Sequence, residues 1–257
     1  MTIEFYKYQG TGNDFIIIDD RKNIFNTNDN DLISALCERR FGIGSDGLIL
    51  LREHDNFDFE MIYFNSDGLQ SSMCGNGGRC IVSFAKILGI IGNETTFMAI
   101  DGAHKAKIVD DDICLKMKDV KKIEIIGNGV FLDTGSPHYV KLVDNLKSLN
   151  VKQEGYRLRN QDIFKKEGVN VNFVMNADEL EVRTYERGVE TETFSCGTGV
   201  VATAIAMHYT NIIKDDSIYI KTRGGMLSVD FEKFNDCYQN IWLTGSANLV
   251  YVGEFEC

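Results

Sequence analysis

Cys74-Gly75-Asn76-Gly77 and Cys196-Gly197-Thr198-Gly199 are two copies of one phrase, Cys-Gly-x-Gly, within a chain of 257 residues. Each copy runs straight into an apolar stretch with the length of a helix. Cys196 lies 122 residues after Cys74, and the same spacing relates Gly102 to Gly224, each of which heads a strand-like segment. A repeat this long predicts two copies of one domain. If the copies pack about a pseudo-dyad, the two thiols face each other across a cleft.

The length of the chain suits two domains of roughly 120 residues, each large enough for its own core. We expect an N-terminal domain over residues 1–121 and a C-terminal domain over residues 122–246, with a strand at about 247–257 returning to the first domain. Runs rich in β-branched and aromatic residues predict strands. These runs are 3–8, 15–19, 48–51, 57–65, 138–142, 171–175 and 180–185.

Three segments predict helices of two kinds. Residues 29–39 place Leu32, Ile33, Leu36 and Cys37 on one face, which is typical of a surface helix. The stretch 199–207 carries no charge, and 80–88 carries only that of Lys86. A helix that is apolar all round is buried. The expected fold class is therefore α/β (α+β), with a mixed sheet or barrel wrapped around a central helix in each domain.

Composition and charge exclude some functions. Hydrophobic residues make up 44% of the chain and charged residues 25%, which is ordinary for a globular protein. A net charge of −11 argues against a nucleic-acid partner. The N-terminus lacks the pattern of a secretion signal, and the uncharged stretch 197–211 is too short to span a membrane, so we expect a cytoplasmic protein. Seven cysteines, an odd number, predict free thiols.

The two Cys-Gly-x-Gly phrases point to acid–base chemistry. The first turn of a helix presents unpaired N–H groups and partial positive charge, which bind anions and stabilise a thiolate. Two such helix ends would hold one carboxylate, with a sulfur on either side of the neighbouring carbon. That arrangement predicts racemisation or epimerisation at the α-carbon of an amino acid, with the helix ends stabilising the enediolate. No pyridoxal phosphate site is recognisable, so we expect neither a cofactor nor a metal.

Other interpretations of the cysteines stay open. A lone cysteine before glycine is usually a small buried hydrophobe. A thiol redox or metal-binding protein could use Cys74, Cys80 and Cys196, although the Cys-x₅-Cys spacing is poor for zinc. A protein that only binds carboxylates would have no reason for a thiol on both sides.

The sequence resembles the diaminopimelate epimerases nearly from end to end, and the order and spacing of the matching motifs carry the resemblance. The motifs are Gly10-Thr11-Gly12-Asn13-Asp14-Phe15, Gly42-Ile43-Gly44-Ser45-Asp46-Gly47, Phe64-Asn65-Ser66-Asp67-Gly68, Cys74-Gly75-Asn76-Gly77-Gly78-Arg79-Cys80, Pro137-His138, Val169-Asn170, Tyr185-Glu186-Arg187-Gly188 and Glu192-Thr193-Phe194-Ser195-Cys196-Gly197-Thr198-Gly199. The resemblance implies conversion of LL-diaminopimelate to the meso form without pyridoxal phosphate, on the route to lysine and peptidoglycan. It also implies paired domains, and we expect a homodimer.

The resemblance assigns roles to particular residues. Cys74 and Cys196 become the acid–base pair. The substrate ligands become Asn13, Asn65, Asn170, Glu186 and Arg187, with the amides of Gly75, Asn76, Gly197 and Thr198. His138 matches a histidine beside the site, where an orienting or electrostatic role is expected, although a satisfied loop histidine fits the sequence equally well.

Two positions depart from the family pattern. The pair Glu186 and Arg187 indicates the kind of substrate. Ser136 stands where many members have an asparagine, and Gly47 where some have a glutamine. A racemase of the same fold acting on proline, hydroxyproline or histidine is the alternative. Arg187 with Glu186 favours a substrate that has a second amino-acid end, because that end carries a carboxylate and an ammonium. Taken alone, the two residues would be a solvated charge pair.

Overall fold

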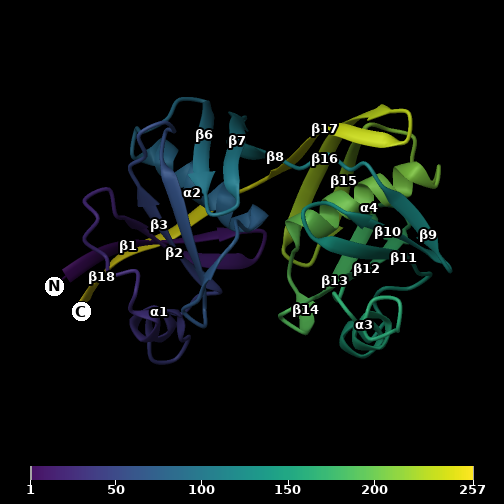
Figure 1. Cartoon of the computed structure of the whole chain (residues 1–257), viewed down its shortest axis with the longest axis horizontal. Coiled ribbons are helices and arrows are strands. Elements are labelled where there is room, and N and C mark those ends of the chain that lie inside the picture. Colours follow the sequence, from purple (N-terminus) through teal and green to yellow (C-terminus); the bar gives the residue numbers. More distant parts are fainter. Residues whose placement is uncertain (1, 257) are drawn as a thin grey trace. The chain divides into compact units, whose positions relative to one another are not determined.

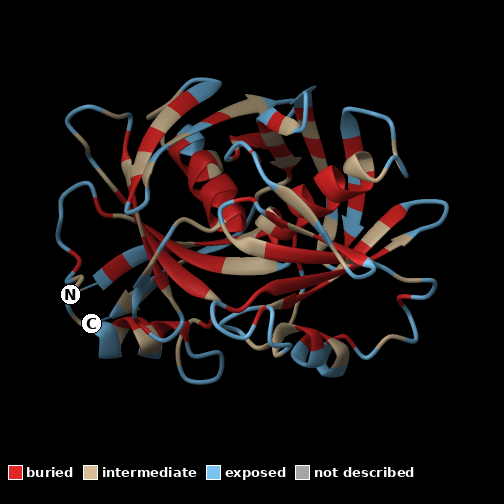
Figure 2. Ribbon diagram, turned by 45° about the vertical axis from the view of Figure 1, so that its right-hand side comes forward, coloured by how far each residue is buried: buried red, intermediate tan, exposed pale blue. Residues whose placement is uncertain are grey.

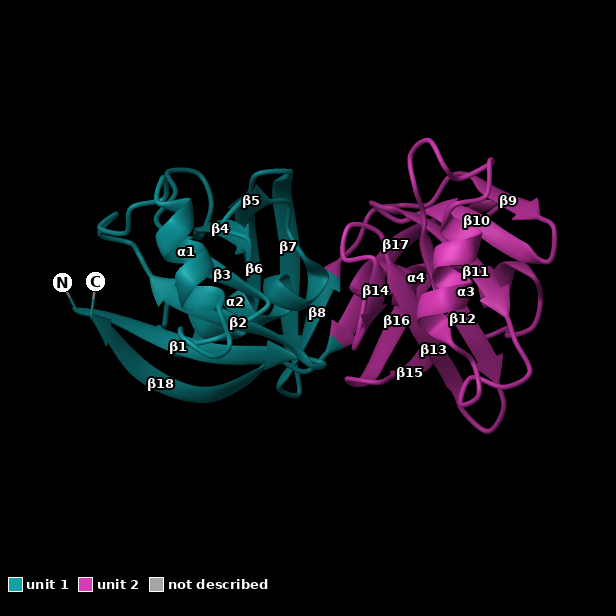
Figure 3. Ribbon diagram, turned by 90° about the horizontal axis from the view of Figure 1, so that it is seen from below, with its two compact units in different colours: residues 1–115, 245–257 teal, residues 116–244 magenta. Residues whose placement is uncertain are grey.

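The computed structural model describes residues 2–256, and the chain divides into two compact units (Figures 1 and 3). Unit 1 contains residues 1–115 and 245–257, and unit 2 contains residues 116–244. The chain passes from one unit to the other within strand β8 and again at the end of β17.

Unit 1 is a mixed sheet with two helices. Its strands are β1 (Thr2–Gly10), β2 (Asn13–Asp19), β3 (Gly47–Arg52), β4 (Glu60–Asn65), β5 (Gln70–Ser71), β6 (Glu94–Ala99), β7 (Gly102–Val109), β8 (Asp112–Lys116) and β18 (Asn248–Glu256). Its helices are α1 (Asn30–Cys37) and α2 (Gly75–Ile87). The β2–β3 and β4–β6 pairs are parallel, and the other pairs described here, including β1–β18, are antiparallel.

Unit 2 repeats this order of pairings. Its strands are β9 (Ile123–Ile126), β10 (Gly129–Asp133), β11 (Pro137–Leu142), β12 (Asn170–Asn176), β13 (Leu180–Glu186), β14 (Thr191–Thr193), β15 (Ser217–Thr222), β16 (Gly225–Phe234) and β17 (Cys237–Gly245). Its helices are α3 (Val151–Arg159) and α4 (Gly197–Tyr209). The parallel pairs are β11–β12 and β13–β15, which occupy the places of β2–β3 and β4–β6. The duplication predicted from the two Cys-Gly-x-Gly phrases is therefore confirmed.

Each unit contains one helix on either face of its sheet. Residues along most of α2 and α4 are buried, as Figure 2 shows: α4 is apolar on nearly every side, and α2 buries even the polar Asn76 and Arg79 of its first half. The other helices are amphipathic: α1 turns Ile33, Leu36 and Cys37 onto β2 and β3, and α3 turns Val151 and Leu158 onto β12 and β13. Strand residues thus meet a helix on both faces, which explains the unbroken apolar runs in β2 and β3.

Two sequence predictions need correction in their bounds, and one helix was missed. The predicted strand 57–65 begins at Glu60, and the predicted helix 29–39 ends at Cys37, with Asp29 capping it through a hydrogen bond to the Leu32 amide. Helix α3 was not predicted, because Gly155 interrupts a segment that has few apolar residues. A Cβ built on Gly155 would lie 2.3 Å from the Cβ of Tyr185, so close packing against β13 requires glycine there.

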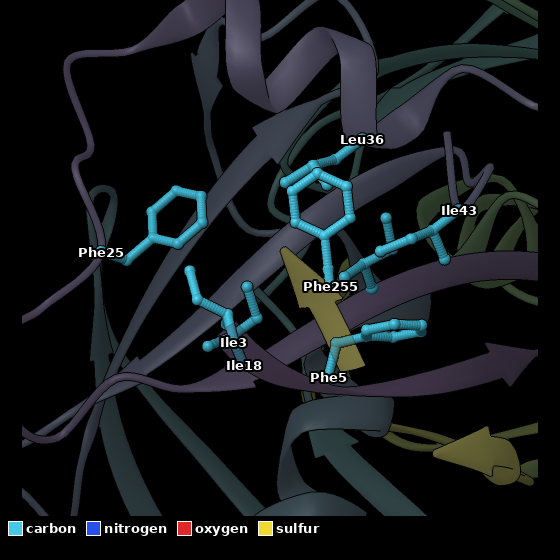
Figure 4. Close-up of a pocket in the computed structure, with 8 residues that line it drawn as sticks. Ile3, Phe5, Ile18, Phe25, Leu36, Ile43 and Phe255 are labelled. Atoms are coloured by element: carbon cyan, nitrogen blue, oxygen red, sulfur yellow. The ribbon is translucent and has the colours of Figure 1, made fainter. Parts of the chain in front are cut away.

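A small gap remains in the core beneath α1 (Figure 4). Its volume of about 10 Å³ is at the lower limit for one water molecule. The residues that line it are all apolar: Ile3, Phe5, Ile16, Ile18, Phe25, Leu36, Ile43 and Phe255. A water needs polar partners, so this gap is a packing feature of the core and not a binding site.

Candidate active site

The two helices that follow the Cys-Gly-x-Gly phrases begin differently from the other two. Asp29 and Asn150 cap α1 and α3 by accepting a hydrogen bond from an amide of the first turn. Cys74 and Cys196 occupy the same N-cap position on α2 and α4, and neither side chain makes a capping hydrogen bond. Neither helix has an acidic residue in its first turn. Each therefore begins with a thiol beside the positive end of a buried helix.

In unit 1 the Cys74 thiol lies beside Asn13. Its Sγ is 3.6 Å from Asn13 Oδ1, and the same oxygen accepts a hydrogen bond from Asn76 Nδ2 at 3.2 Å. The other end of the Asn13 amide donates to Asp46 Oδ2 at 2.5 Å. Since the carboxylate can only accept, it fixes the direction of the amide, and the oxygen of Asn13 faces the sulfur.

A network of charges holds the segment that carries Asn13. Asp14 lies 2.7 Å from Lys7 Nζ and 2.6 Å from Arg39, and Arg39 also reaches Asp46 at 2.8 Å. The buried Lys7 ammonium in addition donates to the carbonyl of Gly44. Burial alone would raise the pKa of the Asp14 carboxyl, but hydrogen bonds from Arg39 and Lys7 outweigh it and hold that pKa at about 2.

Arg79 is a fully buried cation behind the first turn of α2. Its hydrogen bonds run to the Thr11 hydroxyl at 3.0 Å, to Asn76 Oδ1 at 3.1 Å and to the Gly75 carbonyl at 3.4 Å. Burial lowers the pKa of this guanidinium. Thr11 lies in the left-handed region at φ 50°, which is unusual for a β-branched residue. The bond from Arg79 helps to hold that turn, which leads into Asn13.

In unit 2 the Cys196 thiol ends a chain of polar side chains. Its Sγ is 3.4 Å from the hydroxyl of Thr198, which lies 2.9 Å from His138 Nε2. His138 Nδ1 lies 2.9 Å from Asn172 Nδ2, and Asn172 Oδ1 accepts from the Thr184 hydroxyl at 2.9 Å. Burial, assisted by the charge of Arg187, lowers the pKa of His138 to about 3. At neutral pH the ring therefore carries one proton.

Asn170, Glu186 and Arg187 lie together where β12 begins and β13 ends. Asn170 Oδ1 accepts from the Arg187 amide at 2.8 Å, and its Nδ2 donates to Ser136 Oγ at 2.8 Å. The Arg187 side chain is exposed and donates to the Glu167 carbonyl at 2.8 Å. Ser136 thus contacts a predicted ligand, Asn170, from the position where many family members have asparagine.

The structure brings half of the predicted site residues into two clusters, one in each unit. Asn13, Asn76 and Cys74 are joined in unit 1, and His138, Thr198 and Cys196 in unit 2. Asn65 ends β4, where its amide donates to the Leu69 carbonyl and its carbonyl accepts from the Gly68 amide.

Comparison with known proteins identifies the family. The family profile described as "Diaminopimelate epimerase" matches residues 5–123 and 130–250. The chain belongs to the diaminopimelate epimerase family. A diaminopimelate epimerase of Flavobacterium psychrophilum is 54% identical over 252 residues, which cover 97% of this chain and 98% of the relative.

Solved structures share the fold of this diaminopimelate epimerase family member. A phenazine biosynthesis protein of the PhzF family from Bacillus anthracis has a TM-score of 0.78 at 14% identity, covering 100% of both chains. A hydroxyproline epimerase from Agrobacterium vitis has a TM-score of 0.64 at 16% identity, covering 98% of this chain and 92% of its own. Identities this low show a common fold only. Within residues 2–256 no helix is long and apolar enough to cross a membrane.

The sequence prediction omitted four residues that the structure places in or next to the clusters: Asp46, Arg79, Asn172 and Thr184. Asp46 and Arg79 belong to motifs that carry the resemblance to the diaminopimelate epimerases. Asn172 and Thr184 gave a weaker signal, since each is a single polar residue in a strand. Both are buried, and a buried polar side chain needs a hydrogen-bond partner.

Proposed function

We propose that this protein epimerises LL-diaminopimelate to meso-diaminopimelate with Cys74 and Cys196 as its acid–base pair. The observation that carries the proposal is the matched pair of helices, each starting at a cysteine that supplies no side-chain cap. Membership of the diaminopimelate epimerase family supports the substrate. The product would serve lysine and peptidoglycan synthesis.

The proposed reaction moves one proton off the α-carbon and another onto it. The thiolate of one cysteine takes the α-proton, and the electron pair of the C–H bond passes into the carboxylate, which becomes an enediolate. The thiol of the other cysteine then gives its proton to the opposite face of the carbon, and the carboxylate is restored. The amides of Gly75, Asn76, Gly197 and Thr198 would stabilise the negative charge that builds up on the carboxylate oxygens.

The remaining predicted ligands would bind the substrate away from the reacting carbon. Amide groups would contact the polar groups of the substrate, and they would come from Asn13, Asn65, Asn76 and Asn170. Arg187 would bind the carboxylate of the non-reacting end and Glu186 its ammonium. Such a site would disfavour proline or hydroxyproline, which lack a second amino-acid end. His138 would act through Thr198, because the two side chains lie 2.9 Å apart.

A test of the proposal follows the α-proton in deuterium oxide. Purified enzyme and LL-diaminopimelate should lose the α-proton signal in the proton NMR spectrum while the meso isomer forms. Cys74→Ala and Cys196→Ala should each abolish turnover with an unchanged circular dichroism spectrum, because one thiol cannot serve both faces of a carbon. Near-normal turnover by either folded variant would contradict the two-thiol mechanism. Faster turnover of proline than of diaminopimelate by the wild type would contradict the substrate.

We also propose a cytoplasmic homodimer. Support for self-association comes from β18, where Leu249, Val250, Tyr251 and Val252 are 40–56% exposed. Contiguous exposed apolar residues often mark interaction surfaces. Light scattering after gel filtration should give twice the chain mass of 29.0 kDa, and Val250→Lys should shift the species toward the monomer.

A further inference from the structure

Asn172 lies in the middle of the polar chain that ends at Cys196, two side chains away from the sulfur. It is fully buried on β12, in a run of apolar residues, and none of the roles proposed above uses it. Its amide can be oriented in two ways, and the orientation decides which ring nitrogen of His138 carries the proton. Two neighbours contact the amide of Asn172, and one of them, Gly199, decides its orientation.

The first neighbour is Thr184, whose hydroxyl donates to Asn172 Oδ1 at 2.9 Å. The second is Gly199 in the first turn of α4. A Cβ built on Gly199 would lie 2.4 Å from the same Oδ1, so the oxygen faces a Cα–H bond of the glycine. A Cα–H group is a weak hydrogen-bond donor, so an oxygen can accept from it. If the amide were turned round, the hydrogens of its NH₂ group would lie against the Cα hydrogen of Gly199, which is unfavourable. Gly199 therefore puts the oxygen away from His138, and the Thr184 hydroxyl, which can donate or accept, is satisfied as the donor.

The nitrogen of the amide therefore faces the imidazole. Asn172 Nδ2 donates to His138 Nδ1 at 2.9 Å, which requires Nδ1 to be unprotonated. The single proton of the neutral ring is then on Nε2, and it is donated to Thr198 Oγ1 at 2.9 Å. With its oxygen accepting from the imidazole, Thr198 directs its own hydroxyl hydrogen to another acceptor, and Cys196 Sγ lies 3.4 Å away.

Every hydrogen bond on the path from Asn172 to Cys196 thus points toward the sulfur. A hydrogen bond donated to a thiolate favours that form over the thiol. In unit 1 the direction is opposite, since Asp46 orients Asn13 with its oxygen toward Cys74, where it accepts from an S–H group. The two thiols therefore have neighbours of opposite hydrogen-bonding polarity.

We propose that Asn172 is a positioning residue, which holds His138 as the Nε2–H tautomer so that Thr198 donates to Cys196 and keeps it as the base of the resting enzyme. The inference rests on the proposed function for the role of Cys196 as a base. The direction of the hydrogen bonds does not depend on it, and can be measured without substrate.

The first measurement is the ¹⁵N NMR spectrum of the full chain labelled in its histidines. The four histidines of the sequence can be separated by comparison with His138→Gln. We expect the shifts of His138 to show a protonated Nε2 and a bare Nδ1. Asn172→Asp should reverse them, because a carboxylate only accepts and draws the proton to Nδ1. A wild-type ring protonated on Nδ1 would overturn the inference.

The second measurement is the pH profile of alkylation at each thiol, followed by peptide mass spectrometry. A hydrogen bond to a charged group is worth about one to two pH units, so the midpoint for Cys196 should rise by that amount in Asn172→Asp, and the midpoint for Cys74 should stay. Asn176→Asp is the matched control, because it makes the same change at an exposed position of the same strand. It should leave both midpoints unchanged.

A double-mutant cycle separates the hydrogen-bond path from the added charge. Thr198→Val removes the hydroxyl and should raise the Cys196 midpoint by itself, and Asn172→Asp should add nothing in that background. An equal rise in both backgrounds would show a plain charge effect and overturn the inference. If Asn172→Asp fails to fold, two measurements still test the inference: the ring nitrogen that is protonated in the wild-type ¹⁵N spectrum, and the rise of the Cys196 midpoint in Thr198→Val. Should the wild type fail to turn over diaminopimelate, the proposed function fails while these measurements still decide the hydrogen-bond direction.

Discussion

Gly77 and Gly199 occupy the same place in the two halves, each the third residue of a central helix, and an added methyl group should affect them differently. A Cβ on Gly199 would lie 2.4 Å from Asn172 Oδ1 and 3.3 Å from His138 Cε1. A Cβ on Gly77 would lie 3.1 Å from Ile49 Cδ1 and 3.4 Å from Met61 Cε, which are the ends of flexible side chains.

The magnitudes follow from these neighbours. Alanine gains about 1 kcal/mol over glycine inside a helix. At residue 199 that gain is opposed by overpacking, about 2 kcal/mol, and by the loss of one or two buried hydrogen bonds of Asn172, about 1 kcal/mol each. Gly199→Ala should therefore destabilise its unit by about 2–3 kcal/mol. At residue 77 the side-chain ends can shift, so Gly77→Ala should stay within about 1 kcal/mol of the wild type.

The single tryptophan of the chain, Trp242, lies in unit 2 and reports on its unfolding. Urea titrations followed by its fluorescence should show an earlier transition for Gly199→Ala. Titrations followed by circular dichroism should leave Gly77→Ala close to the wild type. The reasoning is refuted if Gly199→Ala unfolds at the wild-type urea concentration, or if Gly77→Ala loses as much stability as Gly199→Ala.

Three further predictions concern charge. Arg187→Met should raise KM for LL-diaminopimelate far more than it lowers kcat. We expect kcat/KM to fall at least about 10-fold, since a hydrogen bond to a charged group is worth about 1.5 kcal/mol or more. Steady-state kinetics that match the wild type would remove Arg187 from the site. Burial, aided by Arg187, lowers the pKa of His138 to about 3, so the unfolded chain takes up a proton on this histidine first, as the pH falls below about 6.5. The stability of the wild type should therefore fall between about pH 6.5 and about pH 3, and the urea midpoint of His138→Gln should fall less over the same range. Parallel curves for the two proteins would contradict the lowered pKa. Burial alone would raise the pKa of Asp14, but hydrogen bonds from Arg39 and Lys7 hold it at about 2. The contribution of Asp14 to stability should therefore be full above about pH 4 and be lost toward about pH 2. Asp14→Asn should lose less stability than the wild type as the pH falls through this range, and an equally steep loss would show that Asp14 does not cause it.

The fold could be predicted because its signals are visible in the sequence itself. The repeat appears as two matching phrases, and each apolar pattern lies within one short segment. The stretches 199–207 and 80–88 predicted two buried helices. The first is buried throughout, whereas the second is buried up to Ala85 apart from the half-buried Ser83, and its end at Lys86 and Ile87 is exposed. Helix α3 lacked such a signal, because Gly155 fits a helix only through its contact with Tyr185. That contact joins residues far apart in the chain.

The site was less accessible to sequence reasoning than the fold. The cysteines and their glycines formed a motif, and the resemblance supplied the ligands. Asn172 looked like an ordinary polar residue of a half-exposed strand, because only the packing of α4 onto β12 buries it. The orientation of its amide depends on Gly199 of α4, which no pattern within one segment connects with β12.

The pairing of β1 with β18 has a consequence for the synthesis of the protein. Unit 2 is one continuous segment, residues 116–244, and all of it leaves the ribosome before β18 does. Unit 1 begins with β1, whose antiparallel partner β18 is made well over a hundred residues after β8. Until then one side of β1 has an open edge, which is a template for pairing with other chains. The second half of the chain can therefore complete its fold first, and the first half must wait for the last strand.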